Sequence, residues 1–540
     1  MTTAVELLRQ GRRDEFWQRY CGFLDLGIGE FMAIQERLLL EQLQLLADCE
    51  LGRRLCGGGV PLTVSEFRRV APITTYHDYI PYLTEQREDV LPVKPVAWAR
   101  TSGSTGDYPA KWCPVTPHYH SKFTKDLYAI FAMAGASYKG DLVLEAGDTL
   151  LYAVAPPPYA TGLATRALDA DGLFRSVPPV AQAETMTFQE RVQQGFLRSM
   201  GAGIGYFGGL ASVLMKMGER FSSGSQKLSF SPAMLQPSTL YRLGRMFVAN
   251  KMSGTGTLPK DIWRPKGILA TGMDVQAYSQ RIKAFWGRAP LEAYACTEFG
   301  TMACQAWDEK RSGLTLIPDA GFWEFMPVSE YHRWRADPTY KPALLLLDAV
   351  QPGEYVLTVT SLGGGPFVRY VIGDLIRVIA LEDESLGIAL PQIRVESRAD
   401  STINLGSMVV LTERAIWNAL TLLDLGLTNW TARKEYDLPR KDPVLHLYVE
   451  NTHLGPERFR ADLNDALIET HEEYASFHGI MQVNPIRVTA LAPGTYDKYL
   501  EARQAEGADL GHLKPPRMEP SDQVLARLVA ISAGSDRGPR

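Results

Sequence analysis

The chain is 540 residues long, 45% of its residues are hydrophobic and 22% are charged. A chain of this length and composition can bury a large core and should divide into two or more domains. Its formal net charge of -5 creates no field that attracts nucleic acid or an anionic membrane, so we expect neither as a partner. Six cysteines without a CxxC pair are too few for a disulfide scaffold, which predicts reduced thiols.

The N-terminal segment carries charged residues where a signal peptide needs its apolar core. No uninterrupted apolar run reaches membrane-spanning length. We therefore expect a cytoplasmic protein that does not bind a membrane. No heptad pattern indicates an assembly, so the sequence leaves the oligomeric state open.

In chain order, residues 30–55 show the first clear pattern, with apolar residues at mixed three- and four-residue spacing among good helix formers. This predicts one or two helices that end before Gly57-Gly58-Gly59. From about residue 145 to 400, short apolar runs alternate with helical patterns, which predicts an α/β architecture with large sheets. The apolar runs are DTLLYAVAP (148–156), GILATG (267–272), ALLLLDAV (343–350) and EYVLTVTS (354–361).

The pattern changes near residue 400, where a small α+β domain is predicted. A helical segment is followed by two strand-like runs, a second helix and a third strand-like run. These segments are residues 413–425, 430–436, 444–450, 456–477 and 486–491. The size of this part is within the usual range of one domain, and the last nine residues are predicted to be a disordered tail.

The segment from Thr101 to Lys111 is rich in hydroxyl residues and glycine and ends in a lysine. Glycine lets a backbone approach an anion closely, and hydroxyls add hydrogen-bond donors, so the loop suits phosphate groups. It is not a Walker loop, because Ala110 and Trp112 flank Lys111 where that pattern needs glycine and a hydroxyl residue. Taken alone, such a cluster is more often a surface turn.

Three segments farther along the chain favour the phosphate interpretation. They are Tyr294–Glu298, which follows the strand-loop segment Ile268–Met273; Arg369–Asp374; and ESRADSTINLG at residues 396–406. Together they offer an aromatic ring for a base, a hydroxyl and a carboxylate for phosphate and Mg²⁺, and an aspartate for ribose. ATP binding without a Walker loop requires these groups.

The order of these segments resembles that of the adenylate-forming superfamily of acyl- and aryl-CoA synthetases, peptide-synthetase adenylation domains and luciferases. Within it, the chain is most similar to the acyl acid amido synthetases of the Gretchen Hagen family. Four stretches carry this closer resemblance: residues 34–55, VAPITTYHDYIPYL (70–83), WEFMP (323–327) and the ending APGTYDKYLEARQAEGADLGHLKPPRM (492–518).

The resemblance implies a fold and an activity. It predicts a large N-terminal adenylation domain (1–398), with β-sheets flanked by helices, that binds nucleotide and acyl acid. A small mobile α+β domain (399–540) would follow a hinge near Arg398 to Asp400. Members of the family use ATP and Mg²⁺ to activate a carboxylic acid as its acyl-adenylate, and then pass the acyl group to the amine of an amino acid.

The resemblance also assigns roles around the triphosphate. The residues that would cradle phosphates are Ser102, Gly103, Ser104, Thr105 and Lys111. Thr297 would contact the α-phosphate and Glu298 would bind Mg²⁺. Lys514 is the candidate for a lysine of the C-terminal domain that reaches the reacting carboxylate.

Further roles concern the nucleoside. The residues that would line the adenine pocket are Thr271, Gly272, Met273 and Tyr294. Asp374 would hold the ribose, and Arg398 would approach it from the hinge.

The sequence departs from the family pattern at three places. Lys111 sits one position late, Cys296 replaces a serine or glycine, and Val371 replaces an arginine whose contact either is supplied by Arg369 or is absent. Two alternatives stay open. An acyl- or aryl-CoA synthetase shares the first half-reaction and differs in its acceptor, and the changes at Cys296 and Val371 leave open a non-catalytic nucleotide-binding protein of the same fold.

Some residues allow competing interpretations. Cys296 and Cys304 are predicted to be inert thiols, because no partnered base is visible nearby. His118 and His120 lack further metal ligands at suitable spacing, so we place this region beside the acyl pocket. Arg517 could bind an anionic substrate or pair with a surface carboxylate.

Overall fold

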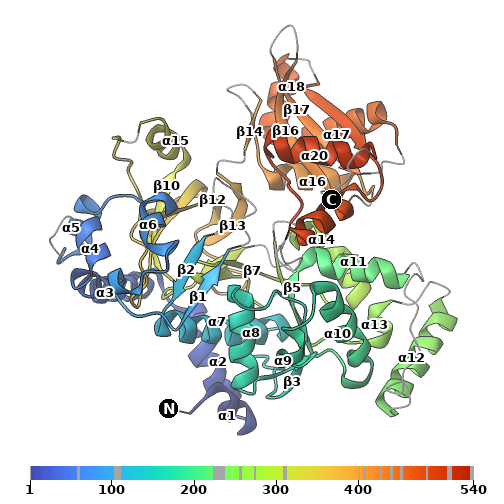
Figure 1. The fold of residues 1–540 in the computed structure, drawn as a ribbon, viewed down its shortest axis with the longest axis horizontal. Coiled ribbons are helices and arrows are strands. Elements are labelled where there is room, and N and C mark those ends of the chain that lie inside the picture. Colours follow the sequence, from blue (N-terminus) through green and yellow to red (C-terminus); the bar gives the residue numbers. More distant parts are fainter. Residues whose placement is uncertain are drawn as a thin grey trace. The chain divides into compact units, whose positions relative to one another are not determined.

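The computed structural model describes residues 2–56, 61–101, 111–222, 237–253, 258–272, 275–307, 313–337, 339–399, 402–405, 409–425, 427, 429–437, 442–450, 454–481, 484–506 and 514–534 (Figure 1). The chain forms two compact units. Unit 1 comprises Met1–Ile372 and Ile376–Val395, and unit 2 comprises Gly373–Leu375 and Glu396–Arg540. Each unit is described separately.

Unit 1 contains an 11-stranded sheet with the order β10-β11-β12-β13-β9-β8-β7-β6-β5-β3-β4. Strands β3 to β7 pair in parallel, whereas β7, β8, β9 and β13 pair antiparallel, as do β10 and β11. The strands are β3 (Asp148–Tyr152), β4 (Phe174–Val177), β5 (Tyr206–Leu210), β6 (Gly267–Thr271), β7 (Leu291–Cys296), β8 (Gly300–Cys304), β9 (Leu314–Leu316), β10 (Phe322–Pro327), β11 (Gly353–Thr360), β12 (Tyr370–Ala380) and β13 (Gln392–Arg398).

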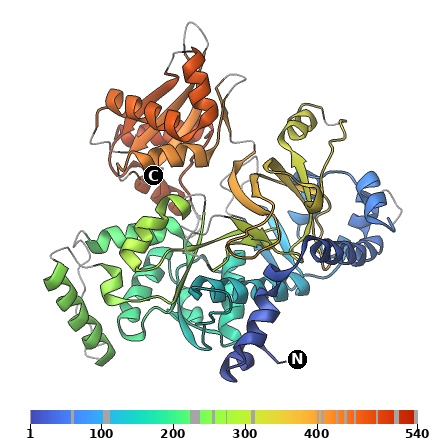
Figure 2. The same ribbon diagram turned by 180° about the vertical axis from the view of Figure 1, so that it is seen from behind.

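The helices of unit 1 connect these strands and cover the sheet. Helices α3 and α4, in blue, lie toward the end of unit 1 that contains β10, and the green helices α10 to α13 lie toward its opposite end (Figures 1 and 2). Parallel strands require such crossovers, and covering helices explain their apolar sequences. The helices before the parallel strands are α1 (Ala4–Arg9), α2 (Arg13–Cys21), η1 (Gly22–Asp25), α3 (Ile28–Ala47), α4 (Glu50–Leu55), α5 (Val64–Val70), η2 (Tyr76–Tyr79), α6 (Ile80–Leu83), η3 (Glu88–Val90) and α7 (Pro117–Gly135). Those that follow are α8 (Ala160–Ala170), α9 (Val180–Ala183), α10 (Phe188–Ala202), α11 (Ala211–Ser222), α12 (Pro237–Ser253), α13 (Pro259–Ile262), α14 (Val275–Trp286), α15 (Val328–Ala336) and η5 (Leu347–Ala349).

Helix α7 connects the core of unit 1 to the site described below. Thr116 caps it by accepting a hydrogen bond from the Tyr119 amide, and Pro117 occupies the first turn, where a missing N–H costs nothing. The helix is buried without a break from residue 126 to 135 and packs against β6, β7 and β8. Its first two turns carry polar side chains instead, and these line a pocket.

Unit 2 contains a three-stranded sheet, in which β16 (Trp430–Asp437) and β17 (Asp442–Glu450) are antiparallel and β17 and β18 (Ile486–Leu491) are parallel. A short ribbon of β14 (Ile403–Asn404) and β15 (Val410–Leu411) precedes it. The helices are α16 (Glu413–Leu422), α17 (Pro456–Thr470), α18 (Glu472–Met481), α19 (Thr495–Ala505) and α20 (Asp522–Ser532). Buried side chains of β17, α19 and α20 share one apolar cluster.

The α/β class of the large part and the α+β class of the small part are confirmed. The prediction for residues 30–55 is also confirmed, since α3 and α4 occupy them. The apolar run at 343–350 is not a strand: Leu345 makes one isolated bridge to Phe325, and a 3₁₀ turn follows. Among the described residues, no helix is both long and apolar enough to cross a membrane.

Two further predictions for unit 2 were wrong in detail. The segment 456–477 forms two helices, because His471 adopts an extended backbone after α17 and its Nδ1 accepts a hydrogen bond from the Tyr474 amide in the first turn of α18. The predicted tail begins too early, since Ser532 ends α20 and its hydroxyl accepts a hydrogen bond from the Ala492 amide. Residues 535–540 lie outside the described residues.

Candidate functional site

The phosphate-type loop connects the two strands of a hairpin. Strand β1 (Ala97–Arg100) pairs antiparallel with β2 (Trp112–Val115). The Thr101 amide donates to the Lys111 carbonyl (2.9 Å), and the Lys111 amide donates to Thr101 Oγ1 (3.0 Å), so both ends of the loop are fixed. The predicted phosphate-binding residues Ser102, Gly103, Ser104 and Thr105 lie outside the described residues.

Lys111 meets two other sequence motifs through one phenol. Its Nζ donates to the Tyr370 hydroxyl (3.3 Å), and that hydroxyl donates to Glu298 Oε1 (3.3 Å). The Lys111 Nζ also lies 5.2 Å from the centre of the Tyr76 ring, within the range of a cation–π contact. Three segments that are far apart in the sequence therefore meet at Tyr370. No role was predicted for this phenol, although its residue belongs to a quoted motif.

Glu298 and Thr297 lie in the tight turn between β7 and β8. A register shift between Tyr294 and Ala295 precedes the turn, and such bulges re-aim the side chains that follow. The Thr297 carbonyl accepts a hydrogen bond from the buried Tyr119 hydroxyl (3.1 Å), which ties the turn to α7. Glu298 is half-buried and lines the pocket beside α7.

The residues predicted for adenine occupy the carboxyl ends of β6 and β7. Thr271 ends β6, which runs parallel to β7, where Tyr294 is located. This edge of a parallel sheet is where ligands usually bind. Gly272 has a φ of +123°, which favours glycine. Tyr294 is buried at 8% exposure within the hydrophobic core, and Met273 lies outside the described residues.

The two residues predicted for ribose belong to unit 2 and bind each other. Arg398 Nη1 donates to Asp374 Oδ1 (2.8 Å). Gly373 has a φ of +84°, and a Cβ there would lie 2.7 Å from Arg398 Nη2, so the pair needs glycine beside it. Lys514 also belongs to unit 2 and is exposed.

Arg369 does not supply the contact of the arginine missing at position 371, so that suggestion is wrong. Its side chain is 7% exposed, and Nε and Nη2 donate to both carboxylate oxygens of Glu324 (2.8 and 2.9 Å). Its Nη1 donates to the carbonyls of Arg68 and Ala71. Arg68 Nε also donates to Glu324, in the WEFMP stretch, at 2.9 Å. We call Glu324, Arg369 and Arg68 the Glu324 clamp.

The Glu324 clamp fixes the backbone directly before Tyr370. Arg369 has a φ of +43°, which is costly for a residue with a side chain and persists only where the surroundings impose it. Its amide donates to Thr360 Oγ1, and its carbonyl accepts from the Thr74 amide. The clamp therefore sets the direction in which the Tyr370 ring leaves the strand. Sequence reasoning did not find it, because its three members are distant in sequence.

Arg517 lies against two tryptophan rings of unit 2. Its guanidinium lies over the rings of Trp417 and Trp430, at 4.9 and 5.3 Å, and it donates to the Trp430 carbonyl. This arginine of the C-terminal motif therefore stabilises the core of unit 2.

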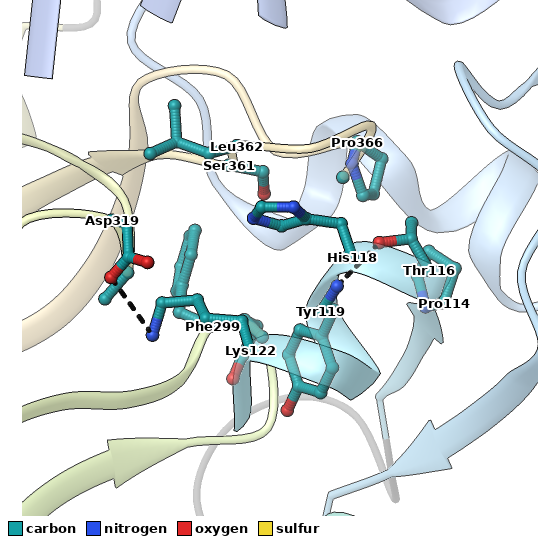
Figure 3. Close-up of a pocket in the computed structure, with 13 residues that line it drawn as sticks. Pro114, Thr116, His118, Tyr119, Lys122, Phe299, Asp319, Ser361, Leu362 and Pro366 are labelled. Carbon is teal, nitrogen blue, oxygen red and sulfur yellow. Dashed lines mark hydrogen bonds and ion pairs between the residues drawn. The ribbon is translucent and has the colours of Figure 1, made fainter. Parts of the chain in front are cut away.

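The pocket beside Glu298 lies within unit 1 (Figure 3). The pocket is shallow and partly open to solvent. Its walls come from β2, the start of α7, the turn after β7 and the segments that follow β9 and β11. The lining residues are Pro114, Thr116, His118, Tyr119, Lys122, Glu298, Phe299, Asp319, Ala320, Ser361, Leu362, Gly365 and Pro366. His118 lines this pocket, and its predicted place beside the acyl group stays a prediction.

Three titratable groups near the pocket, His118, Cys113 and Cys304, have shifted pKa values. Burial lowers the pKa of His118, which favours a neutral imidazole. Burial raises the pKa of the Cys113 thiol well above its ordinary value, and the nearby Glu298 charge adds to this shift. Burial also raises the pKa of the Cys304 thiol. The pKa shifts keep these two thiols protonated, and all six cysteines are free, as predicted.

Glu298 fits a magnesium ion that is held mainly by phosphates. Among the described residues, no group of three or more His, Cys, Asp or Glu side chains could hold a metal ion. Mg²⁺ in nucleotide sites needs only one or two carboxylates beside phosphate oxygens and water. The single carboxylate of Glu298, half-buried beside Lys111 and Tyr370, has this character.

Solved structures of adenylate-forming enzymes share the fold. The AtGH3.15 acyl acid amido synthetase, solved in complex with 2,4-DB, is 18% identical with a TM-score of 0.63, and the likeness covers 92% of this chain and 93% of that one. A 2-hydroxyisobutyryl-CoA ligase in the postadenylation state, in complex with 2-HIB-AMP, is 14% identical with a TM-score of 0.58 over 94% of this chain and 93% of that one. The fold is therefore that of the adenylate-forming enzymes.

Three family models define the family. They match residues 28–182 (GH3 family N-terminal domain), 314–398 (GH3 family central domain) and 412–523 (GH3 family C-terminal domain). The chain belongs to the GH3 family, which confirms the resemblance found in the sequence. The models leave residues 183–313 unmatched, so the assignment of Thr297 and Glu298 depends on their motif and their position in the structure.

Curated plant proteins are related to the chain in sequence. Indole-3-acetic acid-amido synthetase GH3.8 of Oryza sativa subsp. indica is 24% identical over 270 residues, which cover 46% of this chain and 42% of that protein. Indole-3-acetic acid-amido synthetase GH3.5 of Arabidopsis thaliana is 26% identical over 275 residues, covering 46% and 43%. The chain thus spans less than half the length of these two relatives. A probable indole-3-acetic acid-amido synthetase, GH3.4 of Oryza sativa subsp. japonica, is 21% identical over 89% of this chain and 85% of its own length.

Proposed function

We propose that the protein is an ATP-dependent, AMP-forming amide ligase. It activates a carboxylic acid as an acyl-adenylate with release of pyrophosphate, and then transfers the acyl group to the amine of an amino acid or a related amine. Membership of the GH3 family supports this class of reaction. The observation that carries the proposal is the meeting of Lys111, Tyr370 and Glu298, from three separate segments, beside one pocket.

The geometry suits the charges of the first half-reaction. A carboxylate that attacks the α-phosphate of ATP must overcome repulsion between two anions, so the site must supply positive charge and donors. Lys111 brings a cation to the base of the hairpin loop, and Glu298 would bind the Mg²⁺ that offsets phosphate charge. Tyr370 sets the distance between this cation and this carboxylate. Thr297, next to Glu298 in the same turn, would contact the α-phosphate.

The remaining assignments complete the proposal. Tyr294, Thr271 and Gly272 would border adenine at the edge of the parallel strands, and Asp374 and Arg398 would exchange their mutual ion pair for contacts to ribose. We infer that unit 2 is the mobile domain, with a hinge near Arg398 to Asp400, and that its Lys514 reaches the reacting carboxylate. The cytoplasm is the proposed location.

Acid-dependent pyrophosphate release tests the first half-reaction. With a broad panel of carboxylic acids, we expect release that needs ATP, Mg²⁺ and one class of acid. Glu298→Gln should reduce kcat/KM by about 100-fold or more, because it removes the carboxylate that would bind the Mg²⁺ that offsets the phosphate charge. Tyr370→Phe should reduce it by about tenfold, through the loss of one hydrogen-bonding group. Glu354→Gln, a surface change on β11, is the control.

Two outcomes would overturn the proposal in different ways. Absence of release with every acid, or equal release by Glu298→Gln and wild type, would exclude the adenylation step and favour a nucleotide-binding protein. Product masses with amino acids and CoA as competing acceptors test the second step. A thioester as the sole product would replace the amide ligase by an acyl-CoA synthetase.

A further inference from the structure

The pocket beside Glu298 has a polar wall and an apolar wall. His118, Lys122, Asp319 and Ser361 point toward the same hollow, and Phe299 lies behind Lys122 (Figure 3). Leu362 and Pro366 add apolar surface from the segment after β11. A pocket for a purely apolar acid does not need a buried lysine. The polar wall therefore suits a ligand with a polar group that can form hydrogen bonds to it.

Lys122 is the most deeply placed charge of this wall, because its side chain is only 8% exposed. It lies one helical turn from Asp126, whose side chain is also 8% exposed, and forms an ion pair with it. A second carboxylate, Asp319, lies at the pocket mouth and is 45% exposed. One cation thus faces two carboxylates. The wall has no surplus positive charge for a second carboxylate on the ligand.

The distance between Lys122 and Asp319 lets one oxygen atom beside the pair contact both side chains. Nζ of Lys122 and Oδ1 of Asp319 are 3.9 Å apart, which is longer than a direct N–H···O hydrogen bond. An ammonium group has three donors and an ionised carboxylate only accepts. A hydroxyl group can accept from the first and donate to the second at once.

We propose that this pocket selects carboxylic acids that carry a hydroxyl group, which binds between Lys122 and Asp319. The proposal rests on the proposed function, because it names the class of acyl substrate. An apolar acid would cover Lys122 and Asp319 without replacing their water contacts, which disfavours it. A dicarboxylic acid would bring a second negative charge beside Asp319, which disfavours it for a different reason.

Acids with matched carbon skeletons test this selectivity. Suitable sets are the hydroxybutanoic acids with butanoic and butanedioic acid, and the hydroxyphenylacetic acids with phenylacetic acid. Pyrophosphate release is measured without an acceptor amine, so that only recognition of the acid is observed. In at least one set, we expect kcat/KM for a hydroxy acid to exceed that of both its relatives by about tenfold or more.

Two variants connect the selectivity to these side chains. Lys122→Met keeps the length of the side chain and removes its donors, and Asp319→Ala removes the acceptor at a site exposed enough to preserve folding. Both should reduce the preference for the hydroxy acid to about threefold or less, from the loss of one hydrogen bond. Lys125→Met, on an exposed position of the same helix, should leave the preference unchanged.

Calorimetric binding of the same acids to the full chain without ATP separates this inference from the proposed function. Preferential binding of a hydroxy acid that both variants abolish would support the inference even if no pyrophosphate were released. Pyrophosphate release with equal or better use of the apolar acids would overturn the inference and leave the function intact. Neither binding nor release with any acid of these sets would count against both.

Discussion

Two arginine–carboxylate pairs, one in each unit, differ in how they are built. In the Glu324 clamp of unit 1, the Arg369 and Glu324 side chains are 7% and 1% exposed and share two hydrogen bonds. In unit 2, the Arg398 and Asp374 side chains are 34% and 15% exposed, and one hydrogen bond of 2.8 Å joins them. A buried bidentate pair is costly to break, whereas a partly exposed single contact is easily exchanged for a ligand. The first pair thus suits a scaffold, and the second suits a binding surface.

The Glu324→Gln variant tests the buried side of this comparison and should have the largest effect. It leaves the Arg369 guanidinium buried without its counter-charge, which typically costs about 3–5 kcal/mol of unfolding free energy. Urea unfolding followed by circular dichroism measures the change. The matched control is Glu354→Gln, whose partner Arg377 is 51% exposed, and it should change stability by less than about 1 kcal/mol. Equal losses in the two variants would contradict a special role for the clamp.

A third pair, Lys122 and Asp126, is also buried and should make the stability of unit 1 depend on pH. Burial raises the pKa of Asp126 from 3.8 to about 7, although the neighbouring Lys122 opposes the shift. Between these values the folded protein holds a proton that the unfolded chain has released. Stability therefore falls as pH rises through this window, by at most about 1.4 kcal/mol per pH unit from this group.

In the Asp126→Asn variant, the fall of the unfolding free energy with rising pH should be smaller by the contribution of Asp126. The charged groups that face Asp126 are Lys122, Asp319 and Lys125, and all three remain in the variant. Urea unfolding at several pH values between about 4 and 7 gives the difference between the two slopes. Parallel curves for wild type and variant would show that Asp126 keeps an ordinary pKa.

The Asp374→Asn variant tests the partly exposed pair and should have the smallest effect on stability. Loss of this ion pair should change the unfolding free energy by less than about 1 kcal/mol. If Asp374 holds ribose, the KM for ATP should rise by about tenfold, the equivalent of one good hydrogen bond to a charged group. Pyrophosphate release at varied ATP gives the value. A large loss of stability with an unchanged KM would reverse the roles assigned to the two pairs.

The sequence predicted local structure well where one pattern governs a segment. The periodic apolar residues at 30–55 and the strand at 486–491 needed no information from elsewhere in the chain. The run at 343–350 was misread, because four consecutive leucines also suit a segment that packs on β10 without joining the sheet as a strand. The break at His471 was missed, because helix formers on both sides of it continue the same pattern.

For the site, the sequence by itself determined the family and the residue types available: a lysine at the end of a hydroxyl-rich loop, a carboxylate after β7 and an aspartate after Gly373. Motif order is a property of the chain, so it could be read without coordinates. Only the tertiary structure decided that Tyr370 joins Lys111 to Glu298, that Arg369 belongs to a buried clamp, and that Lys122 faces Asp319 in the pocket. The physical reason is that hydrogen bonds and ion pairs depend on distances between side chains, which folding sets even between residues 259 positions apart, such as Lys111 and Tyr370.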